Sequence, residues 1–369
     1  MSTKTMTICG TRPELIKISE IIKQLDIYTN HVLVHTAQNY DYELSQIFFN
    51  ELGIRKPDYT LNVKADTIGG QIANIMTQCE QVMLKEKPEV VFILGDTNSA
   101  LSCIIAKRLR IIIYHLEAGN RCFDNRVPEE INRRIIDHTA DINMCYTEHA
   151  RRNLLNEGIP TQNIFVVGSP LWEVYNAHML RVNSSKILEK LNLIKNNYIL
   201  ASIHREENVT IGDKLLTIMD TLVKLTKIHD MPIIFTTHPR TRNYLEDSGF
   251  KHDRIILHKP FGMFDYINLQ KNAFCNVSDS GTAHEDAALL GIPMVIVRES
   301  NERPEAYDTG NVIMTGLDGD TINDSVGMVI KQRGVHFTNP YGKEPCSQIV
   351  VRLILGQHGI ISKKEYYEL

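Results

Sequence analysis

The sequence contains none of the short signatures that mark several common classes of protein. Its seven cysteines are scattered over 369 residues without a Cys-x-x-Cys pair, which favours buried thiols in a reducing compartment over a disulfide scaffold. No His-Glu-x-x-His motif occurs among the 14 histidines, so we expect no metal site. There is no Gly-x-Gly-x-x-Gly after the first predicted strand and no Walker loop. The dinucleotide-binding and P-loop classes therefore lose their main support.

Long apolar runs and a large excess of one charge are also missing. No apolar run approaches the ~18 residues that a membrane span needs, and patches such as residues 90–94 are strand-sized. Gly10, Arg12 and Glu14 interrupt the apolar stretch that a signal peptide would need. The formal net charge of −4 supplies no overall attraction for nucleic acid or anionic membrane. We expect a cytoplasmic protein that binds neither, and any phosphate must be held by a local site.

What the sequence does contain is a regular alternation of short β-branched runs and longer amphipathic stretches. The first series predicts strands at 5–9, 31–36, 90–94, 111–116, 142–146 and 164–167, with helices at 13–25, 41–52, 67–86 and 128–138. The second series predicts strands at 198–203, 233–237, 255–258, 273–277 and 294–297, with helices at 213–228, 284–290 and 322–331. Two successive series of this kind predict an α/β protein with two Rossmann-like, doubly wound domains. We place these domains at residues 1–169 and 170–344.

Polar clusters follow five predicted strands at their carboxyl ends, where open parallel sheets bind ligands. They cover residues 10–14, 95–98, 117–121, 204–208 and 278–282. One such cluster could be a cap or a turn, but five at equivalent positions indicate an active-site cleft between the domains. The cations that could hold a diphosphate are Arg12, Lys17, Arg133, His204, Arg205 and Arg303. The candidate acid–base groups are Asp96, Glu117, Glu129 and Glu130.

Some of these signals have simpler interpretations. Ser280 and Gly281 open a predicted helix whose free N–H groups could cradle a phosphate, and a plain Ser N-cap is an equally supported alternative. Lys17 lies about one helical turn beyond Pro13 and could be a solvated lysine. Residues 318–320, Asp-Gly-Asp, look like a metal-binding pair but lie in a Gly-rich connection, which favours a turn and a helix cap.

The clusters carry a resemblance to a known family. The segments GTRPELIK at 10–17, GDT at 95–97, EAGNR at 117–121, PEEINR at 128–133, HREEN at 204–208, SDSG at 278–281 and NERPEA at 301–306 occur in this order. Together they resemble the non-hydrolysing UDP-N-acetylglucosamine 2-epimerases, which have the two-domain glycosyltransferase-B fold. The resemblance implies a UDP-sugar substrate, a homodimer, and a C-terminal helix, about 345–369, that packs back on the first domain. No cofactor is expected, because the reaction is redox-neutral.

Two segments resemble a distinct branch of this family. TAQNYDYEL at 36–44 and EAGNRCFDNRVPEEINRRIIDH at 117–138 are similar to UDP-N-acetyl-L-fucosamine synthases of capsule and O-antigen pathways. These enzymes invert C2 of UDP-2-acetamido-2,6-dideoxy-L-talose. The loop between Arg121 and Pro128 is shorter than in the UDP-N-acetylglucosamine enzymes, and residues 39–41, Asn-Tyr-Asp, replace their usual His-Arg run. In some of those enzymes this region helps bind an activating second UDP-N-acetylglucosamine, so the departure puts such activation in question.

The resemblance also implies roles by motif position. The family eliminates UDP, holds a 2-acetamidoglycal and adds UDP back, so Asp96, Glu117 and Glu129 become the proton-handling residues. His204 becomes the contact to the leaving phosphate. The assisting residues are Arg12, Lys17, Arg133, Arg205, Ser280 and Gly281. Asp286 is placed for the ribose hydroxyls, although relatives usually carry Glu there, and Arg303 lines the uracil-ribose side or locks the cleft.

Four other functions remain open at this point. A UDP-N-acetylglucosamine 2-epimerase that forms UDP-N-acetylmannosamine would share the elimination machinery and differ only in the sugar pocket. A glycosyltransferase of the same fold would need an acceptor. A non-catalytic nucleotide-sugar sensor would not need three carboxylates. A hydrolysing relative would result if the glycal escaped.

Overall fold

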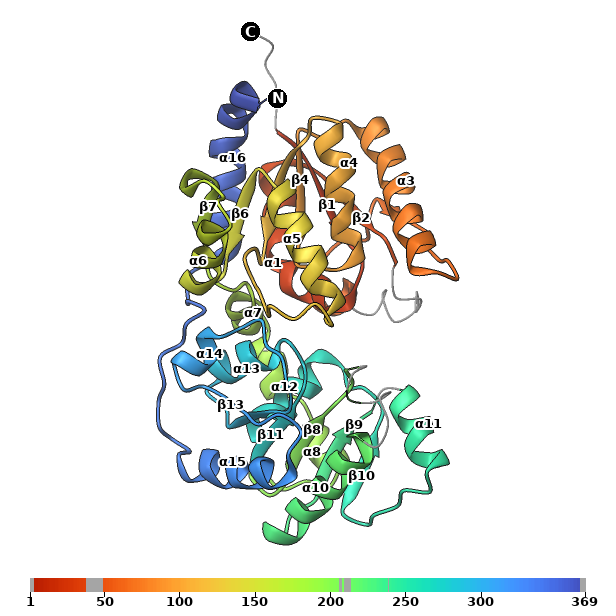
Figure 1. Ribbon diagram of the computed structural model, residues 1–369, viewed down its shortest axis with the longest axis vertical. Coiled ribbons are helices and arrows are strands. Elements are labelled where there is room, and N and C mark those ends of the chain that lie inside the picture. Colours follow the sequence, from red (N-terminus) through yellow and green to blue (C-terminus); the bar gives the residue numbers. More distant parts are fainter. Residues whose placement is uncertain (1–2, 38–48, 206–207, 209–213, 238, 366–369) are drawn as a thin grey trace. The chain divides into compact units, whose positions relative to one another are not determined.

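The computed structural model describes residues 3–37, 49–205, 208, 214–237 and 239–365 (Figure 1). The chain forms two compact units. Unit 1 comprises Met1–Asn176 and Tyr341–Leu369, and unit 2 comprises Ala177–Pro340. The first boundary falls inside α7 (Leu171–Asn183), whereas the sequence placed the seam at residue 169. Most of the helix expected at 41–52, and the distinctive residues Asn39, Tyr40 and Asp41, lie outside the described residues.

Unit 1 is built on a seven-stranded parallel sheet in the order β3-β2-β1-β4-β5-β6-β7. The strands are β1 Lys4–Cys9, β2 Asn30–His35, β3 Tyr59–Thr60, β4 Val90–Leu94, β5 Ile112–Leu116, β6 Ile142–Cys145 and β7 Ile164–Val166. The helices are α1 Arg12–Tyr28, α3 Ile68–Glu86, α4 Cys103–Arg108, α5 Pro128–Thr139, α6 Glu148–Asn156 and α16 Cys346–Glu365, with 3-10 turns at Asn98–Ser102 and Thr161–Asn163. The central strands β4 and β5 are buried along their whole length, as is typical of a sheet covered on both faces, and β4 is apolar throughout.

Unit 2 has a six-stranded parallel sheet in the order β10-β9-β8-β11-β12-β13. Its strands are β8 Ile199–Ser202, β9 Ile233–Thr236, β10 Ile255–His258, β11 Cys275–Ser278, β12 Met294–Ile296 and β13 Ile313–Met314. Its helices are α8 Ile187–Lys190, α10 Lys214–Ile228, α11 Pro239–Asp247, α12 Met263–Asn272, α13 Ala283–Leu290, α14 Glu305–Asp308 and α15 Gly319–Lys331. The expected fold class, two parallel-sheet α/β domains, is therefore confirmed.

Each sheet has one position at which the strand order reverses. In unit 1 the chain runs outward from β1 to β2 and β3, then returns to β4 and continues in the opposite direction. In unit 2 the reversal lies between β8 and β11. At such a position the two neighbouring connections leave in opposite directions, which opens a crevice at the carboxyl ends of the strands. The loops after β1, β4, β8 and β11 flank these two crevices, and they contain four of the five polar clusters.

The structure adds two strands that the sequence pattern did not indicate. β3 and β13 have two residues each and lie at sheet edges, so they are too short to show an alternation of their own. Asp318 is the N-cap of α15, and its Oδ1 accepts the N–H of Thr321 at 2.8 Å. The helix-cap interpretation of residues 318–320 is therefore confirmed, with α15 beginning at Gly319 rather than at Ile322.

The C-terminal helix α16, dark blue in Figure 1, belongs to unit 1 and packs on α1 and β5. Ser347 Oγ donates to Glu173 Oε1 at 2.6 Å near the start of α16, and Tyr114 Oη donates to the carbonyl of Leu353 at 3.2 Å. Among the described residues no helix is both long and apolar enough to cross a membrane. In the same part of the chain no group of three or more His, Cys, Asp or Glu side chains could hold a metal ion.

The contribution of α16 can be measured with two neighbouring residues. Ile354 is fully buried, whereas the Leu355 side chain is 39% exposed. We expect Ile354→Ala to lower the free energy of unfolding by about 2–5 kcal/mol, because it leaves a cavity under the helix. Leu355→Ala removes a similar side chain and should cost less than about 1 kcal/mol. Urea unfolding followed by circular dichroism checks this, and equal losses in the two variants would contradict the packing of α16.

Candidate active site

The carboxyl edge of the unit 1 sheet is lined by three tight loops that follow β1, β4 and β5. Leu94 and Leu116 are register partners, and the N–H of Gly95 donates to the carbonyl of Leu116 at 2.9 Å. Gly95 has φ +67° and Glu117 has φ +71°. A non-glycine residue in the left-handed region is held there only by its surroundings, and such residues concentrate at functional sites. A Cβ atom on Gly95 would lie 3.9 Å from Glu117 Oε2, so this carboxylate lies beside the loop that carries Asp96.

Glu117 is held by a cation and a phenol. Lys17 Nζ lies 2.7 Å from Glu117 Oε2, and Tyr146 Oη donates to the same oxygen at 3.0 Å. The side chains of Lys17 and Glu117 are only 6% and 13% exposed. The solvated-lysine alternative for Lys17 is therefore wrong. The sequence did not point to Tyr146, because it ends the strand predicted at 142–146 and looked like an ordinary strand residue.

Asp96 is held by residues of α5. Arg133 Nε donates to Asp96 Oδ2 at 2.8 Å, and the Asn132 amide donates to the Asp96 carbonyl at 2.9 Å. Arg133 Nη1 also donates to Glu130 Oε2 at 2.9 Å. One arginine thus bridges a partly exposed carboxylate at the sheet edge and a fully buried one in the helix.

The two adjacent glutamates of α5 have different surroundings. Glu130 is fully buried and accepts the N–H groups of Cys122 and Phe123. Burial by itself raises the pKa of Glu130, but hydrogen bonds from Cys122 and Arg133 outweigh it and leave the pKa below its usual value. Glu130 therefore holds the 121–128 loop on α5. Glu129 is exposed on the first turn of the same helix.

The loop after β1 is held by Glu14. Glu14 Oε2 accepts the N–H groups of Gly10 and Thr11 at 3.0 and 2.8 Å, and Glu14 Oε1 accepts the hydroxyl of Thr97 at 3.0 Å. This carboxylate therefore joins the loops after β1 and β4. Burial raises the pKa of Glu14 to about 7, against the lowering effect of these hydrogen bonds. Arg12, at the start of α1, is partly buried, and burial lowers its pKa while the charge of Glu51 acts in the opposite direction.

In unit 2 the loops after β8 and β11 are joined by Asp279, which the sequence analysis did not single out. Asp279 accepts the N–H groups of His204 and Arg205 at 3.0 and 2.9 Å and the side-chain amide of Asn208 at 2.9 Å. The His204 ring is 48% exposed, with Nδ1 3.5 Å from Asp279 Oδ1. Arg205 Nε donates to the carbonyl of Asp279 at 3.0 Å. Asp279 is fully buried, so it fixes the loop and leaves the His204 ring at the surface.

Ser280 and Gly281 lie in the same loop, immediately before α13. A Cβ atom on Gly281 would lie 3.2 Å from Glu302 Oε1 and 3.5 Å from Arg205 Nη2, so this glycine permits a close approach of charged groups. The Ser280 hydroxyl lies 3.2 Å from the Thr282 hydroxyl, and Thr282, not Ser280, is the N-cap of α13. The Ser N-cap alternative is therefore wrong.

Two predicted substrate contacts in unit 2 are buried and already paired with protein groups. Asp286 is 4% exposed, and its Oδ2 accepts from Gln270 Nε2 at 2.9 Å. Arg303 is 2% exposed, with Nη1 3.5 Å from Glu285 Oε2. These residues lie on or against α13. In unit 2, the structure thus places four of the predicted residues in the loops after β8 and β11, namely His204, Arg205, Ser280 and Gly281. Asp286 and Arg303 are buried on or against α13.

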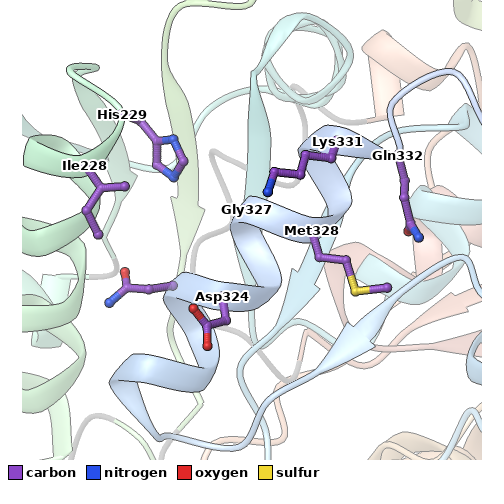
Figure 2. Close-up of a pocket in the computed structure, with 8 residues that line it drawn as sticks. Ile228, His229, Asp324, Gly327, Met328, Lys331 and Gln332 are labelled. Atoms are coloured by element: carbon purple, nitrogen blue, oxygen red, sulfur yellow. The ribbon is translucent and has the colours of Figure 1, made fainter.

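A groove of about 530 Å³ lies elsewhere in unit 2, between the end of α10 and α15 (Figure 2). It is lined by Ile228, His229, Asn323, Asp324, Gly327, Met328, Lys331 and Gln332. None of the predicted site residues lies in it. The case for the active site therefore depends on the side-chain networks at the strand ends.

The buried carboxyl of Glu14 makes stability depend on pH. Its folded-state pKa of about 7 lies above the 4.5 of an ordinary glutamate, so the folded protein binds this proton more tightly and loses stability as the pH rises through this range. Relative to Glu14→Gln, we expect the free energy of unfolding of the unsubstituted protein to fall by about 2–3 kcal/mol from pH 5 to pH 8. Urea unfolding of both proteins at pH 5 and pH 8 measures this change. If the difference in the free energy of unfolding between the unsubstituted protein and Glu14→Gln is the same at both pH values, the prediction is wrong.

The chain is similar to known proteins over nearly its whole length. A structure of UDP-N-acetylglucosamine 2-epimerase from Rickettsia bellii is 42% identical over 100% of both chains, with a TM-score of 0.93. The Methanocaldococcus jannaschii UDP-GlcNAc 2-epimerase in complex with UDP-GlcNAc and UDP is 34% identical, covering 96% of this chain and 100% of that one, with a TM-score of 0.90.

A relative with a different name is also similar over most of the chain. The UDP-2,3-diacetamido-2,3-dideoxy-D-glucuronate 2-epimerase of Pseudomonas aeruginosa is 35% identical over 327 residues, which are 87% of this chain and 91% of that protein. Residues 23–355 match the sequence profile described as UDP-N-acetylglucosamine 2-epimerase. The named members of this family are isomerases that act on UDP-sugars, and the chain belongs to the UDP-N-acetylglucosamine 2-epimerase family.

Proposed function

We propose that the protein inverts C2 of a UDP-2-acetamido sugar by eliminating and re-adding UDP. The observation that carries this proposal lies at the carboxyl edge of the unit 1 sheet. Asp96 and Glu117 follow neighbouring strands, and each is held by a buried cation, Arg133 at 2.8 Å and Lys17 at 2.7 Å. Membership of the family and the names of the relatives support the same reaction.

The chemistry explains why two carboxylates and several cations are needed. The hydrogen at C2 has no adjacent carbonyl, so a carboxylate alone cannot remove it. When UDP leaves C1, positive charge develops at the ring and makes this hydrogen acidic. The C1–O and C2–H bonds break to give UDP and a 2-acetamidoglycal, and a carboxylate takes the proton. Proton delivery to the opposite face of C2 and return of UDP to C1 complete the inversion with no net oxidation.

The proposal draws on both units. Asp96 and Glu117 exchange the proton with C2, and Glu129, exposed on α5, is the third candidate for this role. His204 contacts the leaving diphosphate, since its ring is exposed on a loop that Asp279 holds. The proposed supporting contacts to substrate are Arg12, Lys17, Arg133, Arg205, Ser280 and Gly281. Asp286 is proposed to bind the ribose, and Arg303, buried against Glu285, is proposed to stiffen the nucleoside side.

Neutral substitutions test the two carboxylates. We expect Asp96→Asn and Glu117→Gln each to lower kcat by about 10²–10⁴-fold, the usual contribution of one acid–base group, with KM nearly unchanged. Glu89→Gln is the matched control, because Glu89 lies just before the amino end of β4 and its side chain is 55% exposed. Proton NMR of product formation measures all three. Full activity in Asp96→Asn or in Glu117→Gln would remove that residue from the mechanism.

For the sugar, we propose UDP-2-acetamido-2,6-dideoxy-L-talose as substrate and UDP-N-acetyl-L-fucosamine as product, for capsular or O-antigen polysaccharide synthesis. The support is the short 121–128 loop, which Glu130 ties to α5 through the N–H groups of Cys122 and Phe123. The Pseudomonas aeruginosa relative shows by its name that similar chains act on a sugar other than UDP-N-acetylglucosamine. UDP-N-acetylglucosamine is the alternative substrate, supported by the Methanocaldococcus jannaschii complex. We also propose a homodimer, on the resemblance alone.

Turnover in deuterated water with each donor offered separately distinguishes the substrates. We expect deuterium at C2 of UDP-N-acetyl-L-fucosamine, because the proton that returns to C2 comes from a group that exchanges with solvent, and no change in UDP-N-acetylglucosamine. Inversion of UDP-N-acetylglucosamine instead would establish the alternative. The assay contains no acceptor, so a glycosyltransferase would give no product. Net release of UDP and free sugar would indicate a hydrolase.

A further inference from the structure

Beneath the loops that carry Asp96 and Glu117 lies a buried charged cluster that the proposed mechanism does not use. It consists of His115 on β5, Asp137 on α5 and Arg121 in the loop after β5, each at most 2% exposed. Asp137 Oδ1 lies 2.8 Å from His115 Nδ1, and Asp137 Oδ2 lies 2.6 Å from Arg121 Nη1. Glu157, at the end of α6, accepts two further hydrogen bonds from Arg121 at 2.8 and 2.6 Å. An arginine and a histidine are thus set against two carboxylates.

The His115 ring lies between the carbonyl of Gly95 and the carboxylate of Asp137. Nε2 lies 2.8 Å from the carbonyl oxygen of Gly95, which can only accept a hydrogen bond. Nδ1 faces the carboxylate of Asp137. Burial by itself raises the pKa of Asp137, but interactions with His115 and Arg121 outweigh this effect and hold the pKa below its usual value.

This cluster connects both catalytic loops to one rigid point. Through His115 it holds the carbonyl of Gly95, the residue immediately before Asp96. Asp137 Oδ2 accepts the N–H of Gly119 at 3.1 Å, two residues after Glu117, and Arg121 Nη1 donates to the carbonyl of Asn120 at 2.8 Å. Gly119 has φ +84°, and a Cβ there would lie 2.3 Å from the carbonyl oxygen of Ala150, so the second loop has little room to shift.

We propose that His115, held by Asp137, is a positioning residue that fixes the distance between Asp96 and Glu117. It contacts neither substrate nor the reacting atoms. This inference rests on the proposed function, because it concerns the two carboxylates that exchange the C2 proton. Without the hydrogen bond to Gly95, the loop after β4 loses one of its restraints and Asp96 moves relative to Glu117. Proton transfer is sensitive to such shifts, and a displacement of ~1 Å can cost about 100-fold in rate.

The decisive comparison uses two variants of His115 and one control. His115→Leu fills a similar volume but donates no hydrogen bond, whereas His115→Gln retains a side-chain N–H for Gly95. Asp141→Asn is the matched control. Asp141 is also a buried carboxylate, but it binds Lys107 and the N–H of Ile113 at the opposite end of β5.

We expect His115→Leu to lower kcat by about 10–100-fold with KM within about threefold, and His115→Gln to recover part of the loss. Asp141→Asn should keep its kcat although its unfolding midpoint falls. Each rate is divided by the concentration of folded enzyme, and thermal unfolding of each variant gives the folded fraction at the assay temperature. Wild-type kcat in His115→Leu, or an equal fall of kcat in Asp141→Asn, would overturn the proposal.

Hydrogen exchange gives a readout that needs no substrate. We expect the peptide covering residues 94–99 to exchange faster in His115→Leu and at the wild-type rate in Asp141→Asn. Unchanged exchange in His115→Leu would overturn the positioning role. If the unsubstituted protein converts neither donor, the proposed function fails, and the exchange of residues 94–99 alone decides whether His115 holds this loop.

Discussion

The parallel pairing of the strands is the constraint on which every other feature of this protein depends. Because all described strands of a sheet point the same way, every loop that follows a strand emerges at the same edge. The reversal of strand order between β1 and β4, and again between β8 and β11, separates the neighbouring loops and leaves a crevice. The polar clusters lie in these loops, whose backbone N–H and C=O groups are not used in the hydrogen bonds of the sheet.

Charges in these loops are held in pairs. Moving a carboxylate or an ammonium group out of water is costly, and an ion pair offsets the cost only when its geometry is good. Lys17 with Glu117, and Arg133 with Asp96 and Glu130, satisfy this condition at 2.7–2.9 Å. Such pairs add little net stability, but they hold each group in one orientation. A reaction that removes a proton from one face of a carbon and returns one to the other face is faster when the groups that exchange the proton are held in fixed orientations.

The two units hold their loops with the same kind of group. In unit 1 the loops are tied by buried carboxyl groups, such as those of Glu14 and Asp137. In unit 2 a single carboxylate, Asp279, accepts hydrogen bonds from two backbone N–H groups and one amide. In both units the loops that carry the exposed polar groups are held from beneath by buried residues. The proposed mechanism therefore depends on buried residues that do not contact the substrate as well as on those that do.

The sequence by itself determined the fold class, since apolar runs and amphipathic stretches alternate with periods that only parallel α/β units satisfy. It also located the loops with Asp96, Glu117 and His204, because polar residues after buried strands have few structural uses. It did not find β3 and β13, which are too short to carry a pattern, or Tyr146, which ends a predicted strand and looked like an ordinary strand residue.

Only the tertiary structure decided which charged residues are buried and with what they pair. The sequence could not separate Glu129 from Glu130, since adjacent residues on a helix point in different directions and only packing shows which is inside. Nor could it show that Lys17 turns inward to Glu117 or that His115 reaches Gly95, because these partners lie 100 and 20 residues apart. Burial and pairing are set by contacts between distant segments, and local sequence carries no record of them.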